Sequence, residues 1–322
     1  MISADQCVQE TNTDATSSKF SCVRAGYYED EFIDLFASAC TPRRNPIINK
    51  GYYVRVMIFR RLLREFVSQY SDGCQIVFLG AGTDTNGLRV VNSSQSADVK
   101  VFEVDFPEII RKKVRVIQKH SQRLTFLGDV EASSSSHGVI RFGSQFGLID
   151  HDLRSPLQTL TDKLNMTGFN RAKPTLFICE CVLIYMDTYE ANAIIQWIAT
   201  TAATTPAAPR ALAIYEQMNS RDAFGRVMVE NLNARGCSLR SITDSPSSMV
   251  ARLLDLGFTS ARSELMSHFD PLIPVKRPEI IDELEEYNLL QSHYAFTLCW
   301  CGDENFSTFA QKVMELNENQ EN

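Results

Sequence analysis

Short apolar runs and longer stretches of helical spacing alternate along most of this chain. The apolar runs predict five strands, at residues 75–79, 101–105, 146–150, 175–184 and 211–216. A run that is apolar at consecutive positions is typical of a parallel strand buried under helices on both faces. Apolar residues at helical spacing predict helices over Phe20–Phe36, Gly51–Tyr70, Met186–Thr201 and Asp222–Arg235. This alternation favours a doubly wound α/β fold.

The two ends of the chain carry different patterns. Towards the C-terminus we predict a helix over Pro246–Leu256, a charged helix around Glu279–Tyr287 and an apolar strand over His293–Trp300. A late pair of strands after such a helix fits a seven-stranded, mostly parallel sheet with one reversed edge. Residues 1–18 are polar and rich in serine and threonine, so we predict a disordered tail there.

The first predicted strand runs directly into a glycine turn, Gly80-Ala81-Gly82. Glycine permits a tight turn and lets a ligand lie against bare backbone. The second strand ends in Asp105, and strand, glycine turn, helix, strand and acid form a nucleotide-binding unit whose acid holds ribose hydroxyls. A dinucleotide site requires glycine at the sixth position of the turn, where this chain has Thr85. The turn therefore favours S-adenosylmethionine, a nucleoside without phosphates; an ordinary strand–turn–helix with surface glycines is the alternative.

Further candidate residues lie at the predicted ends of other strands, where doubly wound sheets bind ligands. After the third strand, an acid and an apolar residue of the segment 149–154 could bracket an adenine ring. Glu180 lies inside an apolar run, and a buried carboxylate is costly unless it is paired. Its partner is either the amine and sulfonium of a ligand or a lysine or arginine in a buried ion pair. The fifth strand ends in Tyr215-Glu216-Gln217, which are either ligand contacts or structural residues.

Charge and cysteine content exclude several classes of protein. The 322 residues carry a net charge of −7 and no basic block, which argues against a nucleic-acid partner and an anionic membrane surface. No apolar run approaches the roughly 18 residues of a membrane span. The nine cysteines include two C-x-C pairs without partnered histidines, which are poor zinc sites. Reduced thiols, no metal site and a location in the cytosol or nucleus are therefore expected.

The glycine turn is one of several sequence segments that occur in this chain in a particular order. They are Ala25-Gly26-Tyr27, residues 50–55, 79–85, 102–107, 152–154 and 180–186, Tyr215-Glu216-Gln217, Phe224-Gly225, residues 282–286 and His293-Tyr294. Over Lys19–Trp300 the chain resembles the leucine carboxyl methyltransferases, which methylate the C-terminal leucine of the type 2A protein phosphatase catalytic subunit. The resemblance implies a class I, Rossmann-like methyltransferase with N-terminal helices and helical insertions. Within one domain over residues 19–322, it implies a helical lid and cofactor-contact segment (19–70), a nucleotide-binding core (71–216) and substrate-side helices with the final strands (217–300).

The resemblance also implies roles for particular residues. Lys19 and Arg55 would hold the methionine carboxylate of S-adenosylmethionine, and Gly80 would contact the cofactor through its backbone. Asp105 would take the ribose hydroxyls. The remaining cofactor residues would be Asp152 and Leu153, which flank the adenine, and Glu180, which faces the methionine end.

The acceptor implied by the resemblance is a carboxylate, which is already a nucleophile at neutral pH, so the transfer requires neither a general base nor a metal. Arg55, Tyr185 and Tyr215 are the candidates for orienting it. The implied partner is the phosphatase catalytic subunit, whose methylation regulates holoenzyme assembly, and the enzyme itself would be a monomer. Three departures from the family pattern concern details of the substrate surface rather than cofactor binding. They are Ala223 where relatives usually carry arginine, His151 where a small residue is common, and the short serine-rich stretch after Asp129.

Three other functions remain open from the residues alone. The nearest is a methyltransferase of the same superfamily that acts on a modified tRNA base or a small carboxylic acid. A second is a non-catalytic phosphatase-binding protein with a vestigial cofactor pocket, against which the retention of the expected pocket residues argues. A nicotinamide-dependent oxidoreductase is disfavoured by Thr85.

Overall fold

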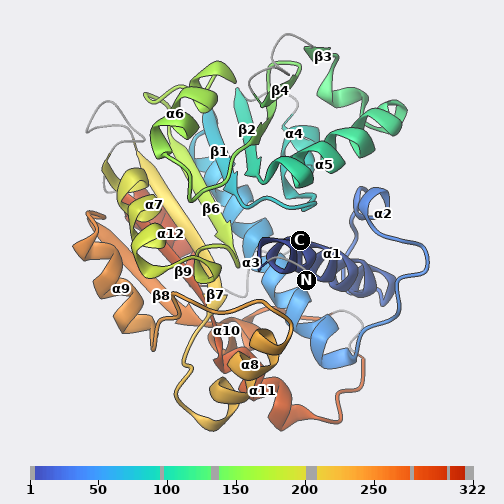
Figure 1. Cartoon of the computed structure of the whole chain (residues 1–322), viewed down its shortest axis with the longest axis vertical. Helices are drawn as coiled ribbons and strands as arrows, with labels where there is room; N and C mark the ends of the chain where they lie inside the picture. The colour runs from blue at the N-terminus through green and yellow to red at the C-terminus, as the bar shows by residue number, and fades with distance from the viewer. Residues whose placement is uncertain are drawn as a thin grey trace.

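A computed structural model describes residues 4–94, 98–131, 138–200, 209–275, 279–302 and 305–315. These residues form one nine-stranded sheet in the order β3-β4-β5-β2-β1-β6-β7-β9-β8, with helices on both faces (Figure 1). The five central strands run parallel. They are β1 (Cys74–Leu79), β2 (Val99–Asp105), β5 (Phe146–Asp150), β6 (Thr175–Glu180) and β7 (Arg210–Gln217).

The burial of the central strands explains their continuous apolar runs. In β1, Ile76 and Phe78 face one hydrophobic cluster, whereas Val77 and Leu79 face a second cluster on the other side of the sheet. The first cluster is covered by α3 (Pro46–Gln69), α4 (Asn86–Ser93), α5 (Pro107–Lys119) and α12 (Asn305–Met314). The second is covered by α6 (Leu157–Met166), α7 (Thr188–Thr200) and α9 (Pro246–Asp255). Two buried faces are why these strands are mostly apolar, and the polar exceptions are paired: Glu103 in β2 with Lys113, and Gln75 in β1 with Asn170 and Thr175.

All five predicted inner strands are present, but the fourth is shorter than predicted. The expected strand 175–184 ends at Glu180. Cys181 then takes a left-handed backbone (φ 57°), and Leu183–Tyr185 forms a 3-10 turn, η4. A non-glycine residue in this conformation is strained, and such strain is concentrated at functional sites. The apolar residues after Glu180 are therefore buried in a turn, which apolarity alone does not distinguish from a strand.

The edges of the sheet confirm one prediction and correct another. As predicted, a reversed edge is present: β9 (Tyr294–Cys301) runs antiparallel to β7, and β8 (Ser260–Leu265) pairs with β9. On the opposite edge, β3 (Val130–Glu131) and β4 (Val139–Phe142) extend the expected seven strands to nine. They were missed because they are short and β4 buries only its two end residues.

The N-terminal segment differs most from its prediction. A helix, α1 (Ala4–Arg24), occupies most of the expected disordered tail. The helix predicted over Phe20–Phe36 is interrupted, because α1 ends before Gly26, which has φ 83°, and only the short α2 (Ile33–Phe36) follows. The polar residues that indicated disorder instead contact the β1–α4 turn through Asn12 and Thr16.

The remaining elements lie mostly at the carboxyl ends of the central strands. Figure 1 shows α8, α10 and α11 grouped at one end of the sheet, near α1. No helix in the described parts of the chain is long and apolar enough to cross a membrane. The further elements are α8 (Ala223–Ala234), α10 (Met266–Phe269), α11 (Leu284–Ser292) and the 3-10 turns Ser121–Arg123, Thr125–Leu127 and Asp270–Leu272.

Candidate functional site

A cavity of about 370 Å³ opens at the carboxyl ends of the central strands, under α1. Its volume falls in the usual range of small-molecule sites, about 300–1,000 Å³. Its lining includes every residue predicted to contact the cofactor: Lys19, Arg55, Gly80, Asp105, Asp152, Leu153 and Glu180. Tyr185 lines it as well, whereas Tyr215 does not. The structure thus brings together residues that are up to 161 positions apart (Lys19 to Glu180) in one enclosed space.

The turn after β1 has glycine at two positions because two other segments pass too close to it for a side chain. Gly80 and Gly82 both have positive φ, 68° and 54°. A Cβ at Gly80 would lie 2.5 Å from Val182 Cγ2, and one at Gly82 would lie 2.5 Å from Asn12 Oδ1. Glycine is therefore required both by the backbone conformation and by the close approach of the turn after β6 and of α1.

Asp105 ends β2 and faces the cavity beside the glycine turn. Its Oδ2 accepts a hydrogen bond from the Gly82 N–H (2.6 Å) and its Oδ1 accepts one from the Phe106 N–H (2.7 Å). Each oxygen keeps a further lone pair that can accept from a ligand hydroxyl. Burial raises the pKa of Asp105 to about 6, although the two N–H donors act in the opposite direction. The carboxylate is ionised at neutral pH and is suited to bind a sugar diol.

The segments after β2 and β5 supply apolar side chains to the cavity. Phe106 and Ile109 follow β2, Leu153 follows β5, and such a surface suits a flat heteroaromatic base. Asp152 is engaged by Arg154, whose Nε and Nη2 donate to its two oxygens at 2.9 and 2.6 Å. His151, the family departure, also lines the cavity, and burial together with Lys163 lowers its pKa, so it is neutral.

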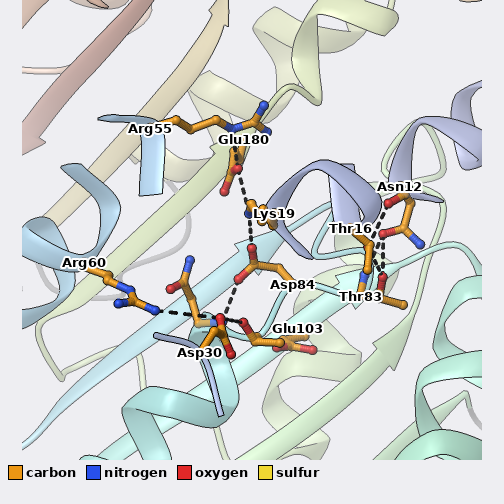
Figure 2. Close-up of polar contacts among 12 residues, drawn as sticks. Asn12, Thr16, Lys19, Asp30, Arg55, Arg60, Thr83, Asp84, Glu103 and Glu180 are labelled. Carbon is orange, nitrogen blue, oxygen red and sulfur yellow. Dashed lines mark hydrogen bonds and ion pairs between the residues drawn. The ribbon is translucent and has the colours of Figure 1, made fainter. Parts of the chain in front are cut away.

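The charged residues of the cavity form one connected network. Glu180 Oε1 lies 2.5 Å from Arg55 Nε and 3.0 Å from Lys19 Nζ, and Lys19 also pairs with Asp84 (Figure 2). Of the two alternatives for Glu180, the structure has the buried ion pair. Burial alone would lower the pKa of Lys19, but Asp84 and Glu180 outweigh it and raise that pKa above its usual range. Two cations and two anions thus line a compact patch, which matches the carboxylate and ammonium groups of an amino acid.

Helix α1 closes the cavity through polar contacts that the sequence reasoning missed. Asn12 Oδ1 accepts from the Thr83 N–H (2.8 Å) and from its hydroxyl (2.9 Å), and Thr16 Oγ1 lies 2.7 Å from Thr83 Oγ1 (Figure 2). At the start of α1, Asp5 pairs with Arg154 at 2.7 Å. The spacing of Asn12, Thr16 and Lys19, which places them on one helical face, was the available signal.

The aromatic end of the cavity corrects one substrate candidate. Tyr215 is buried behind the wall, with its ring 4.6 Å from the Arg55 guanidinium and stacked on Tyr294 with centroids 5.4 Å apart. Tyr294 and Gln217 line the cavity instead. Tyr215 and Gln217 share one face of β7, and Gln217, at the carboxyl end of the strand, lies at the cavity. Tyr215 lies two residues deeper, so it acts on the cavity through Arg55 and Tyr294 rather than by direct contact.

Glu216 is a structural acid rather than a ligand contact. It is buried, and its Oε1 accepts from the Ile184 N–H at 2.9 Å. Burial raises the pKa of Glu216 to about 7, and the backbone N–H groups of the η4 turn partly offset this. Glu216 thus anchors the turn that carries Tyr185. Among the described residues no group of three or more histidine, cysteine or acidic side chains could hold a metal ion.

The fold and the site together define the class of the protein. Five parallel strands with a reversed edge, a glycine turn and an acid at the next strand end form a Rossmann-like, S-adenosylmethionine-dependent methyltransferase. The glycines that a Cβ would block and the buried sugar-binding acid fit this cofactor.

The family follows from the comparisons. Residues 8–199 match the family model for leucine carboxyl methyltransferases, and the chain belongs to that family. It is 36% identical to a leucine carboxyl methyltransferase 1 homolog of Arabidopsis thaliana, over 90% of this chain and 88% of the relative. It is 32% identical to leucine carboxyl methyltransferase 1 of Bos taurus, over 92% and 90%. Its cofactor is therefore S-adenosylmethionine.

Other matches either cover a smaller part of the relative or have a lower sequence identity. The tRNA wybutosine-synthesizing protein 4 of Rattus norvegicus is 32% identical over 92% of this chain, but the match covers only 44% of that protein. Among solved structures, human N-acetylserotonin methyltransferase with S-adenosylmethionine is 12% identical with a TM-score of 0.41, covering 89% of this chain and 67% of that one. Magnesium protoporphyrin IX methyltransferase of Synechocystis is 13% identical with a TM-score of 0.43, covering 88% and 97%.

Proposed function

We propose that this chain methyl-esterifies the α-carboxylate of the C-terminal leucine of the type 2A protein phosphatase catalytic subunit and thereby regulates holoenzyme assembly. The observation that carries the proposal is the match to leucine carboxyl methyltransferases over 90% of this chain and 88% of the Arabidopsis relative.

The chemistry of the cavity supports a carboxylate acceptor. Three of the cavity-lining groups that could remove a proton are Cys181, Tyr185 and Tyr294. Burial raises the pKa of the Cys181 thiol to about 11 and holds the pKa of both phenols well above their usual value. None of the three acts as a general base at neutral pH. An alcohol or an amine would need such a base, whereas a carboxylate arrives already ionised.

We assign the residues of the cavity to positioning rather than to proton transfer. Lys19 and Arg55 would hold the methionine carboxylate of the cofactor, with Glu180 facing its ammonium group and Asp105 the ribose. Asp152 and Leu153 would flank the adenine, and Gly80 would contact the cofactor through its backbone. When bound, S-adenosylmethionine supplies an electrophilic methyl group on sulfonium. An in-line arrangement of the acceptor oxygen with that group can contribute roughly 7–11 kcal/mol of barrier reduction through orientation alone.

The test uses three forms of the phosphatase catalytic subunit with methyl-labelled cofactor: intact, amidated at its C-terminus and extended by one residue. Only the intact form should be labelled, because amidation removes the nucleophile and one added residue moves it by about 3.5 Å. The label should be released by mild alkali, as expected for an ester. Equal labelling of all three forms, or an alkali-stable product, would show that the acceptor is a different group.

A second candidate acceptor follows from the match to the tRNA wybutosine-synthesizing protein. The net charge of −7 and the absence of a basic stripe argue against a tRNA partner. Incubating the enzyme with labelled cofactor and total tRNA from a cell that lacks wybutosine methylation provides the comparison. Labelled tRNA together with unlabelled phosphatase would replace our proposal with this one.

We also propose a reducing compartment, the cytosol or the nucleus. All nine cysteines are free thiols, and most are buried, including Cys22, Cys179 and Cys299. Buried unpaired thiols are typical of proteins outside the secretory pathway. Fractionation of cells that express the tagged full chain tests this, and recovery with secretory vesicles would contradict it.

A further inference from the structure

Tyr294 is a cavity residue to which neither the motifs nor the family resemblance gives a role. It begins β9, directly opposite Gln217 at the end of β7, and both side chains line the cavity. Tyr185 and Met186 line the cavity as well. Tyr294 is linked through the Tyr215 ring to Arg55 and Glu180, the end of the cavity where the proposed function places the methionine part of the cofactor and hence the acceptor.

One face of the Tyr294 ring packs against the Tyr215 ring. The Tyr294 ring lies 5.4 Å from the Tyr215 ring at an interplanar angle of 24°. Tyr215 in turn packs its ring 4.6 Å from the Arg55 guanidinium, and Tyr52 lies 5.0 Å from the same guanidinium. This series fixes Tyr294 relative to Arg55, which pairs with Glu180 at the charged end of the cavity.

The hydroxyl of Tyr294 is fixed by a separate contact. Gln217 Nε2 donates a hydrogen bond to Tyr294 Oη at 3.3 Å. Gln217 is only 4% exposed, and its Oε1 has no hydrogen-bond partner among the described residues. Tyr294 is thus the hydrogen-bond partner that the structure gives to this buried amide. Because a lone pair of Oη is taken by Gln217, the Tyr294 O–H proton is directed elsewhere.

We propose that Tyr294 donates its O–H hydrogen bond to one oxygen of the acceptor carboxylate, and that Gln217 is the positioning residue that aims this hydroxyl. The inference rests on the proposed function, since it requires a carboxylate acceptor. One oxygen held by Tyr294 leaves the other free to approach the methyl carbon. In the transfer, a C–O bond forms as the C–S bond breaks, and its electron pair goes to sulfur. The phenolic proton stays on Tyr294 throughout.

The test is steady-state kinetics of Tyr294→Phe with the intact phosphatase subunit, together with calorimetry of S-adenosylhomocysteine binding. We expect kcat/KM for the acceptor to fall about tenfold or more, the effect of losing one hydrogen bond to a charged group. The loss should appear mainly as a higher KM for the acceptor, with a smaller decrease in kcat. The Kd for S-adenosylhomocysteine should stay within about twofold of the wild-type value. The matched control is Tyr189→Phe, since Tyr189 is 85% exposed on α7 and should behave as wild type.

A double-mutant cycle isolates the role of Gln217. Gln217→Ala should reduce kcat/KM for the acceptor in the wild-type background and change it little in the Tyr294→Phe background. Unchanged acceptor kinetics in Tyr294→Phe would overturn the inference, as would equal losses in acceptor and S-adenosylhomocysteine affinity, which indicate a structural role. Failure of the wild-type enzyme to label a carboxylate is a different result, because it overturns the proposed function itself.

Discussion

Arg55 and Glu180 form an ion pair in the wall of the cavity, with Nε 2.5 Å from Oε1 and both side chains largely buried. Lys19 joins the same carboxylate at 3.0 Å. The residues proposed to hold the two charged groups of the methionine end are therefore also paired with each other. Because the same charged groups serve both the ion pairs and the proposed cofactor contacts, we expect each residue to contribute to stability and to binding.

Glu180→Gln should destabilise the ligand-free protein. The change leaves Arg55 and Lys19 with one carboxylate fewer in a buried site, and breaking a buried pair from one side costs about 3 kcal/mol. Urea unfolding without cofactor measures the loss. Asp34→Asn is the control, because Asp34 pairs with Arg123 on the surface, where both side chains are about half exposed, and should cost less than about 0.5 kcal/mol. Equal stability of Glu180→Gln and wild type would show that the ion pairs of Glu180 with Arg55 and Lys19 do not stabilise the folded protein.

Cofactor affinity should fall in acid because of Asp105. The folded protein holds this proton up to about pH 6, and the protonated carboxyl is a weaker acceptor for ribose hydroxyls. Affinity for S-adenosylhomocysteine should be constant above pH 7 and weaken below pH 6. In Asp105→Ala it should be weaker by about 1.5–3 kcal/mol at pH 7.5 and lose the Asp105 part of the pH dependence. Calorimetry at several pH values checks both, and an unchanged pH profile in the mutant would assign the titration to another group.

The same raised pKa has a consequence for stability. Between about pH 4, where the unfolded chain releases the Asp105 proton, and pH 6, where the folded protein does, the ligand-free protein should lose stability progressively. Above pH 6 this loss is complete. Burial raises the pKa of Glu103 to about 7, against the opposing effect of its partner Lys113, so this acid extends the same trend to about pH 7. Cofactor binding to Asp105 should therefore stabilise the protein more at pH 7.5 than at pH 5, as thermal unfolding with and without S-adenosylhomocysteine would show.

Helix α1 should be the first part of the cavity wall to open. Asn12→Ala removes the acceptor of the Thr83 N–H and leaves this donor unpaired, whereas the Thr83 hydroxyl keeps its contact with Thr16 Oγ1, so the expected cost is about 1–3 kcal/mol. Hydrogen exchange of α1 amides should become faster and S-adenosylhomocysteine should dissociate sooner. Thr13→Ala, an exposed position on the same helix, controls for the higher helix propensity of alanine. Faster exchange in both variants alike would attribute the effect to propensity or fraying rather than to Thr83.

The fold was largely predictable because its signals are local. The run Ile76–Leu79 is apolar at consecutive positions because neighbouring residues such as Ile76 and Val77 face different clusters. A glycine turn followed by Asp105 has few other uses. Features that depend on distant partners were missed. Polar residues of α1 such as Asn12 resemble those of a disordered tail until Thr83 is known to face them. Glu180 was recognised as costly, but which cations pair with it is decided by the packing of α1 and α3 against β6.

The same dependence on packing makes Gly80 a sensitive position, and a matched glycine isolates the reason. Gly80 and Gly26 both have positive φ, 68° and 83°. A Cβ at Gly26 would meet nothing within 4 Å, whereas a Cβ at Gly80 would lie 2.5 Å from Val182 Cγ2. Gly26→Ala should therefore cost only the backbone strain, about 1–2 kcal/mol. Gly80→Ala adds an overlap that costs about 1–3 kcal/mol more.

Removing the obstructing side chain should separate the two costs of Gly80→Ala. In a Val182→Ala background the added methyl group at position 80 no longer meets Val182 Cγ2, so Gly80→Ala should cost about as much as Gly26→Ala does. Cofactor affinity should recover in parallel, because the turn after β6, which carries Glu180 and Tyr185 to the cavity, returns to its place. Chemical unfolding and S-adenosylhomocysteine binding of the single and double variants provide the measurement. If Gly80→Ala is as harmful with Val182→Ala as without it, backbone conformation alone makes glycine necessary at this position.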